Sequence, residues 1–182
     1  VQLVASLDTP GTAQGIAGTD RHIYVADGDQ GLRIINVSIP FAPVVDSIVR
    51  EANQARQVQI QGSYAYITDG ANGLRIINIA SPVRPFQVGQ FNKAGNASDV
   101  YLTGDTYAFL SDLTGGVWVV DISNPAQPLE VGFNALPGSP SGIAAVPTGG
   151  AAAAFRIYAA YGETGLNIFD SARSVIFSRL GK

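Results

Sequence analysis

The stretch YVADGDQGLRIINVSIPFAP, residues 24–43, decides the fold because the chain repeats it. It returns about 42 residues later as YITDGANGLRIINIASPVRP, residues 66–85, with GLRIIN identical in both copies. Two further copies are FLSDLTGGVWVVDISNPAQP, residues 109–128, and YAAYGETGLNIFDSARS, residues 158–174. A period of about 40–45 residues with several short strands per unit is typical of a propeller blade. The repeat therefore predicts an all-β propeller of about four four-stranded blades.

Each copy contains four strand-like runs, which we name A, B, C and D in chain order. The C runs place apolar residues on both faces, as with Leu32, Ile34 and Ile35, so each blade needs a neighbour on either side. The predicted repeats cover approximately residues 14–49, 56–91, 98–133 and 141–180 of one domain, residues 1–182. The A runs centre on Ile16, Val58, Val100 and Ile143, the B runs carry Tyr24, Tyr66, Phe109 and Tyr158, the C runs begin after Gly31, Gly73, Gly116 and Gly165, and the D runs follow Pro43, Pro85, Pro128 and Ser174.

The patterns YVADG…GLRIINVSIP…P and FLSD…GGVWVVDISNP…P resemble LVIVD repeats. The resemblance covers nearly the whole chain, and the first three copies match well. The fourth departs from the pattern, because Tyr161 replaces the Asp and both prolines are missing. The resemblance implies a β-propeller-like fold, a secreted or cell-surface location and an interaction role. It implies no catalytic mechanism, so no catalytic residue is carried over.

The two ends of the chain carry an extra strand signal. Residues 2–7 (Gln2, Leu3, Val4, Ala5, Ser6 and Leu7) read as a D strand that precedes the first blade. Residues 175–180, beginning with Val175, Ile176 and Phe177, read as the D strand of the fourth. One interpretation is a longer propeller of about six to eight blades, of which this chain is a part. A second interpretation is a four-bladed ring whose surplus strand pairs with another subunit by strand addition. A third is an irregular terminus that packs on the surface.

Composition limits the classes of function. The net charge is −3 and lysine occurs only at Lys93 and Lys182, which argues against a surface that follows nucleic-acid phosphates. The chain has no cysteine, which excludes a disulfide, a thiolate zinc site and a thiol nucleophile. No apolar run of about 18 residues predicts a membrane span. The chain begins at Val1, as a processed chain or a fragment would.

Antiparallel strand order places the B–C turns and the D–A loops on one side of the propeller, which we call the loop side. Asp27, Asp29, Asp69 and Asp112 lie in or beside these turns and are the candidate loop-side contacts for a cation or a partner. The run from Asp27 to Asp29 is similar to the start of a calcium loop, but no full ligand series follows it. We therefore favour the interpretation that these residues build turns, and we expect no metal site and no cofactor.

Two arginines and the histidine are the other candidate polar residues. Arg33 and Arg75 occupy equivalent positions, but Trp118 and Asn167 interrupt a ring of arginines, so pairing with nearby carboxylates is the favoured interpretation. His22 is the only histidine, and no acid, base and nucleophile constellation accompanies it. The sequence therefore predicts a protein that is not an enzyme.

Two acceptor triplets for N-glycosylation occur, at Asn36 and at Asn96. Asn96 lies in a glycine-containing D–A loop and is the better exposed candidate, whereas Asn36 is expected to close a turn. The alanine tract at residues 151–154 belongs to an extended fourth A–B loop.

The favoured function is a non-enzymatic, secreted or cell-surface structural and interaction propeller. Self-assembly into a filament would use the terminal strands at residues 2–7 or 175–180. The expected partners are copies of the chain or another surface protein, with no nucleic acid. The alternative is a ligand- or carbohydrate-binding propeller that uses the loop side, or a fragment of a longer surface propeller.

Overall fold

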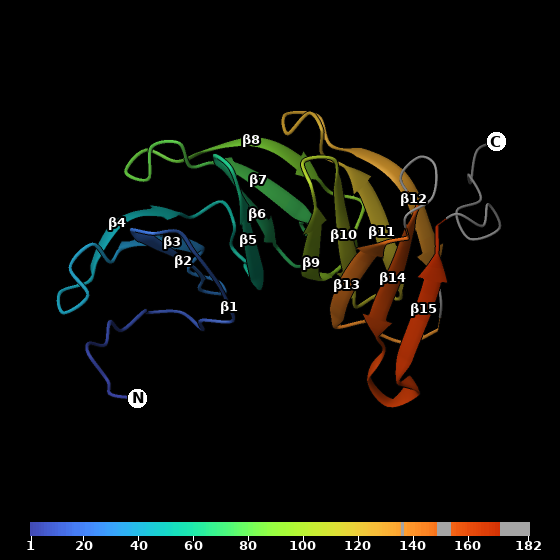
Figure 1. Cartoon of the computed structure of the whole chain (residues 1–182), viewed down its shortest axis with the longest axis horizontal. Helices are drawn as coiled ribbons and strands as arrows, with labels where there is room; N and C mark the ends of the chain where they lie inside the picture. The colour runs from blue at the N-terminus through green and yellow to red at the C-terminus, as the bar shows by residue number, and fades with distance from the viewer. Residues whose placement is uncertain (136, 149–153, 172–182) are drawn as a thin grey trace.

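Four antiparallel sheets make up the described part of the molecule, and they follow one another along an arc (Figure 1). The computed structural model describes residues 1–135, 137–148 and 154–171. The first sheet contains β1 (Gly15–Gly18), β2 (His22–Ala26), β3 (Leu32–Asn36) and β4 (Val44–Val49), and the second contains β5 (Gln57–Gln61), β6 (Tyr64–Thr68), β7 (Leu74–Asn78) and β8 (Phe86–Phe91). The third contains β9 (Ala97–Thr103), β10 (Tyr107–Asp112), β11 (Gly116–Asp121) and β12 (Leu129–Ala135), and the fourth contains β13 (Gly142–Pro147), β14 (Phe155–Ala160) and β15 (Leu166–Asp170), with the short 3₁₀ helix η1 (Gly162–Thr164) between β14 and β15.

Within each sheet the strands lie side by side in chain order, because each is joined to the next by a tight turn. The turn between β2 and β3 ends at Gly31, which has a φ of 89°, a conformation that favours glycine. The pairing of the third with the fourth strand has a bulge at the same place in three sheets, after Ile34, Ile76 and Val119. The bulge bends the outer strand and recurs because the sequence repeats.

The first strands of the four sheets line the inner side of the arc, and β4, β8 and β12 lie on its outer side (Figure 1). Neighbouring inner strands contact each other in the order β1, β5, β9 and β13. One apolar cluster fills each space between consecutive sheets. Between the first and second sheets, for example, Tyr24 and Ile34 share a cluster with Val58, Ile67 and Ile77.

The predicted all-β, propeller-like fold is confirmed. The A, B and C runs of all four repeats are strands, as are the first three D runs. The fourth D run, which includes Val175, Ile176 and Phe177, lies outside the described residues, as does most of the alanine tract. The first and last sheets lie at opposite ends of the arc (Figure 1).

The expected strand at residues 2–7 is absent, and residues 1–9 have no regular secondary structure. The side chains of Leu3, Val4 and Leu7 are exposed instead. A strand is stable only when its backbone groups pair with a neighbouring strand, and none lies beside this segment in the described part of the chain. Among the described residues no helix is long and apolar enough to span a bilayer.

Candidate functional site: the end faces and the loop side of the arc

The last sheet exposes residues that the other three sheets bury. We call the face of a sheet that packs on the following sheet its leading face, and the opposite one its trailing face. On the leading face of β15, Leu166 is 61% exposed and Ile168 is 57% exposed. At the equivalent positions of β3, β7 and β11 the exposed fractions lie between 0% and 5%. These buried equivalents are Leu32, Ile34, Leu74, Ile76, Val117 and Val119.

The first sheet shows the complementary exposure on its trailing face. Ile16 of β1 is 67% exposed, whereas its equivalents Val58, Val100 and Ile143 are buried against the preceding sheet. On the same trailing face Val25 and Ile35 are only 7% and 6% exposed, so Ile16 is the one exposed large apolar side chain there among the described residues of β1, β2 and β3. The arc therefore ends in a leading face on which β15 exposes two apolar side chains and a trailing face on which β1 exposes one. We refer to them as the two end faces.

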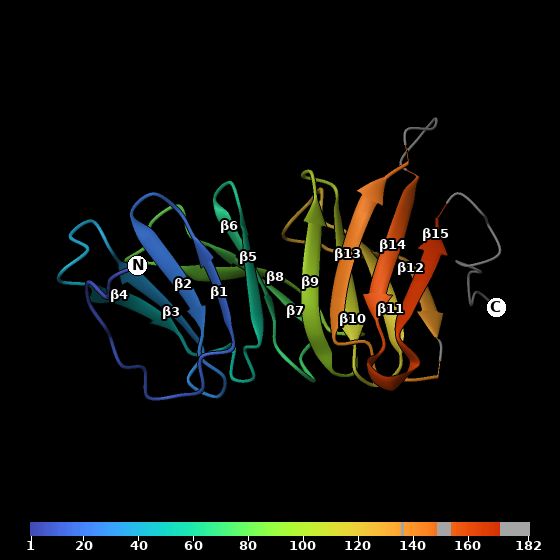
Figure 2. The same cartoon turned by 60° about the horizontal axis from the view of Figure 1, so that its bottom comes forward.

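The loop side is the edge of the arc where the loops leading into β1, β5, β9 and β13 meet the turns before β3, β7, β11 and β15, along the lower edge of Figure 2. Asp27, Asp69 and Asp112 lie here, but they are buried and unavailable to a partner. Asp29 is exposed. The predicted set of exposed loop-side contacts is therefore corrected to Asp29 alone.

Each buried carboxylate joins three parts of the fold. The Asp27 carboxylate accepts hydrogen bonds from Thr9 Oγ1 at 2.8 Å, from the Gly11 backbone at 3.2 Å and from Arg33 Nε at 2.6 Å. It thus ties the segment before β1 and the side chain of a β3 residue to the turn between β2 and β3. The favoured interpretation of turn-building residues fits this arrangement.

The second and third sheets repeat the arrangement with different donors. Asp69 accepts from the Gln54 backbone at 2.6 Å and pairs with Arg75. Asp112 accepts from the backbone of Gly95 and of Asn96 at 2.8 and 2.9 Å, and from Trp118 Nε1 at 3.1 Å. The expected pairing of Arg33 and Arg75 with carboxylates is thus observed. Their constant spacing of six residues from an aspartate was the signal in the sequence that could have identified the partners.

Hydrogen bonding sets the acidity of two of these groups. Burial by itself raises the pKa of Asp27, but the hydrogen bonds from Arg33, Thr9 and Gly11 outweigh it, so this pKa lies below its usual value. The pKa of Asp112 is also lowered, because hydrogen bonds led by those from Thr114 outweigh the effect of burial. Both side chains therefore remain ionised through the neutral pH range.

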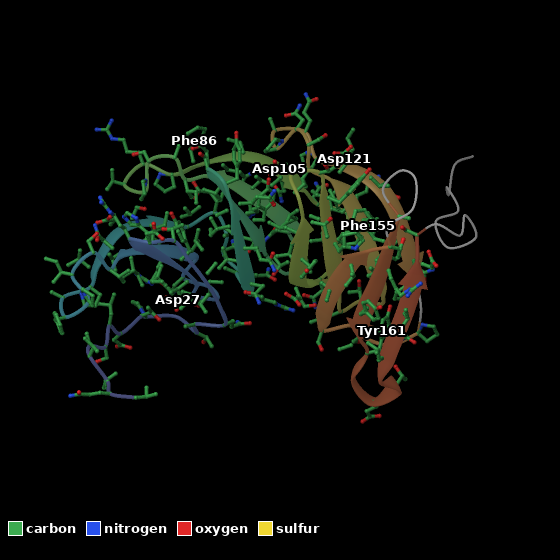
Figure 3. All side chains as sticks on the ribbon, viewed as in Figure 1. Asp27, Phe86, Asp105, Asp121, Phe155 and Tyr161 are labelled. Carbon is green, nitrogen blue, oxygen red and sulfur yellow. The ribbon has the colours of Figure 1, made fainter. Side chains whose placement is uncertain are left out.

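In the last sheet Tyr161 takes the place of the aspartate (Figure 3). Its ring is buried and packs near Phe169, with 6.5 Å between the ring centroids. Its hydroxyl oxygen is buried and has no hydrogen-bond partner among the described residues. Burial raises the pKa of this phenol.

The loop side also holds a polar pocket of about 470 Å³. Gln14, Arg56, Ser98 and Ser141 line it, and each stands at the same position just before or at the start of an inner strand. The remaining lining residues are Gln57, Asp99 and Leu113. Asp99 accepts from the backbone of Val100 at 2.9 Å and of Ile143 at 3.0 Å, yet burial raises its pKa.

The remaining candidate residues have structural surroundings. His22 Nε2 lies 3.0 Å from Asp46 Oδ2, and Asn36 Nδ2 lies 3.3 Å from the same oxygen. Asn36 Oδ1 accepts from the Ser38 backbone at 3.0 Å and closes the predicted turn. Asn96 is half-buried beside Asp112. Within the described ranges no three His, Cys, Asp or Glu side chains are grouped to hold a metal ion.

The family model for the LVIVD repeat matches three segments, residues 10–50, 52–93 and 94–134. The chain belongs to the LVIVD-repeat family. In this LVIVD-repeat protein each matched segment contains the core of one of the first three sheets, and the fourth sheet follows the matched segments. No curated protein matches the chain.

Solved structures share the fold at low identity. The computationally designed protein Ika4 matches with a TM-score of 0.63 and 10% identity, over 93% of this chain and 98% of Ika4. Saccharomyces cerevisiae Sqt1 matches with a TM-score of 0.69 and 8% identity, over 82% of this chain and 42% of Sqt1. The designed protein Ika8 matches with a TM-score of 0.65 and 6% identity, over 87% of this chain and 45% of Ika8. This LVIVD-repeat chain thus spans less than half the length of two of the three.

Proposed function

We propose that this protein is a non-enzymatic structural and interaction module that joins a second copy of itself end to end. The leading face of the last sheet in one copy would pack on the trailing face of the first sheet in the other. The observation that carries the proposal is the exposure of Leu166 and Ile168 at positions where the other three sheets bury their side chains. An apolar sheet face of this kind marks an interaction site.

The repeated packing inside the chain favours a second copy as the occupant of these faces. Inside the chain, the leading face of each sheet already packs on the trailing face of the next, through three apolar clusters. Leu166 and Ile168 at one end and Ile16 at the other are apolar like their equivalents inside the chain, so a second copy offers side chains of matching chemistry. Burying a leucine or isoleucine side chain stabilises by about 1.5–3 kcal/mol, so Ile16, Leu166 and Ile168 together favour association.

The curvature of the arc suggests a closed particle. The chain follows the fold of Sqt1 and Ika8 over 42% and 45% of their lengths. Two copies joined head to tail with the same curvature would return to their starting point as one ring. A head-to-tail contact whose rotation does not close would produce a filament instead.

We also propose a secreted or cell-surface location, which the family resemblance supports. A structural module in that setting acts by presenting its outer and loop surfaces. The exposed side chains on the outer strands, such as Phe86 of β8, belong to those surfaces (Figure 3).

The test is the mass of the intact chain in solution, by light scattering after size-exclusion chromatography. We expect a particle of twice the 18.9 kDa chain. Leu166→Glu should yield a folded monomer, because the charge is tolerated on an exposed face and prevents its burial. Leu129→Glu is the matched control, since Leu129 is equally exposed but lies on the outer strand β12. A wild-type chain that stays monomeric at its highest soluble concentration would contradict the proposal.

A second candidate function is the binding of a polar ligand such as a carbohydrate in the loop-side pocket. Two observations favour it: four sheets contribute equivalent residues to this pocket, and the Arg56 guanidinium has no partner among the described residues. Titration with a panel of oligosaccharides, comparing the wild type with Arg56→Gln, tests it. Equal signals from both proteins would contradict a role for the pocket.

A further inference from the structure

The segment before β1 occupies the position of a connection between two sheets. Three such connections occur inside the chain. In each, one residue of the fourth strand pairs with the residue at or next to the start of the third strand. The buried residue of the next sheet's first strand follows nine positions later. These pairs are Val49 and Val58, Phe91 and Val100, and Asn134 and Ile143. The same spacing from Ile16 leads back to Leu7. Residues 2–7 are thus in register with the outer strands β4, β8 and β12.

Hydrogen bonds fix this assignment independently of the spacing. Thr9 and Gly11 donate to Asp27 as Gln54 donates to Asp69. The backbone of Gln14 donates to the Ala26 carbonyl at 2.9 Å, as that of Arg56 donates to the Thr68 carbonyl at 2.9 Å. Residues 9–14 are therefore held as a sheet-to-sheet loop, although no sheet precedes them in the described chain.

We propose that residues 2–7 of one copy form the fourth, outer strand of the other copy's last sheet, antiparallel to β15. This inference rests on the proposed end-to-end association and names the segment that completes it. In the described part of the chain the fourth sheet has three strands, and β15 pairs with β14 on one edge only. The docking of one copy's first sheet beside the other's last sheet would bring residues 2–7 to this edge.

The repeat also gives the register. Leu32 and Leu74 pair with Val49 and Phe91, which are the equivalents of Leu7. Leu166 is the equivalent of Leu32, so it would pair with Leu7. The other pairs would be Asn167 with Ser6, Ile168 with Ala5, Phe169 with Leu3 and Asp170 with Gln2, with the bulge at Val4.

The sequence of the donated segment fits this position. Ala5 is the equivalent of Ser47, Gly89 and Gly132, so a small residue stands there in all four outer segments. The reason is spatial: Ser47 Oγ donates to the Pro82 carbonyl at 2.5 Å, and a Cβ on Gly89 would collide with the Pro125 carbonyl oxygen. A single copy leaves residues 2–7 without a strand because the edge that they would pair with belongs to the other copy.

Engineered cysteines test the register, because the chain has none of its own. Cα atoms of directly opposed residues lie about 4.5–5.5 Å apart, which suits a disulfide. A mixture of Ser6→Cys and Asn167→Cys chains should therefore form a disulfide between the two variants under mild oxidation. The matched control mixes Ala5→Cys with Asn167→Cys, where a shift of one residue turns the thiols to opposite faces. We expect the first mixture to link about tenfold faster or more.

A second experiment removes the segment. Deleting residues 1–7 should weaken association about tenfold or more, while the melting temperature of the monomer is kept because Thr9 and Gly11 still hold the loop. If the wild type associates but deletion has no effect, or if both cysteine mixtures link at the same rate, strand donation is wrong and end-face docking stands without it. A wild type that does not associate at all would overturn both this inference and the proposed function.

Discussion

Arg33 Nε lies 2.6 Å from Asp27 Oδ2, and both side chains are buried between the first sheet and the segment that leads into it. Arg75 and Asp69 repeat the pair in the second sheet. In the third sheet the indole of Trp118 replaces the guanidinium, and in the fourth Tyr161 and Asn167 occupy the two positions. The buried polar connection is therefore charged in the first two sheets and has a neutral donor in the third, and among the described residues the last sheet has no equivalent of it.

Removing one member of the charged pair should be costly. We expect Asp27→Ala to lower the free energy of unfolding by about 3–5 kcal/mol, because it leaves the Arg33 charge buried without a partner. Urea denaturation followed by tryptophan fluorescence measures the change. Asp29→Ala is the control in the same turn, and since Asp29 is exposed it should stay within about 0.5 kcal/mol of the wild type. Equal effects of the two substitutions would contradict a stabilising role for the buried pair of Asp27 and Arg33.

The lowered pKa values of Asp27 and Asp112 predict a loss of stability in acid. Each folded pKa lies below its unfolded value, so the stabilisation is fully present above the unfolded pKa, about 3.9, and is lost as the pH falls through the folded pKa. Asp112→Asn should remove part of this dependence. Unfolding curves between about pH 2 and pH 7 test it, and an unchanged slope in the variant would contradict the assignment.

Asp99 should act in the opposite direction. Burial raises its pKa, so its contribution is fully present below the unfolded pKa and is lost as the pH rises through the folded pKa. Asp99→Asn should therefore reduce the decline of stability just above about pH 4. The same series of unfolding curves provides the measurement, and a steeper decline in the variant would be the contrary result.

Two glycines with positive φ should differ in their tolerance of alanine. Gly104 has a φ of 52° and open space around it, so Gly104→Ala should cost only the backbone strain of about 1–2 kcal/mol. Gly31 has a φ of 89°, and a Cβ there would collide with the Val49 carbonyl oxygen of the neighbouring strand. Gly31→Ala should add a packing cost of about 1–3 kcal/mol to the strain. Thermal melts of the two variants compare them directly, and an equal cost would contradict the close approach.

Tyr161 offers a substitution that should not destabilise. Its hydroxyl is buried without a hydrogen-bond partner among the described residues, so Tyr161→Phe should raise stability by up to about 1–3 kcal/mol. Tyr161→Leu is the comparison that also removes the ring packed near Phe169, and it should be less stable than the phenylalanine variant. Calorimetric melting temperatures decide the order. A lower melting temperature for Tyr161→Phe would reveal a partner for the hydroxyl.

Some features followed from the chain alone because they depend on local repetition. The period of the GLRIIN stretch, the glycines before each third strand and the alternation of apolar residues predicted strands in all four repeats and their neighbours in each sheet. Turn chemistry also predicted that the aspartates build structure. Their burial was not predicted, because the donors Thr9 and Gly11 lie sixteen or more residues before Asp27 and only folding brings them together.

The sequence by itself determined that the chain forms repeated sheets with two apolar faces. It also carries the LVIVD pattern that assigns the family. Only the tertiary structure decided which of these faces are covered. Leu74 and Leu166 have the same residue type at the same repeat position, yet one is fully buried and the other is 61% exposed. The physical reason is that burial depends on whether another sheet stands alongside. The position of a residue along its strand fixes the face of the sheet on which its side chain lies. The sheet that packs on that face comes from a distant part of the chain or from another copy.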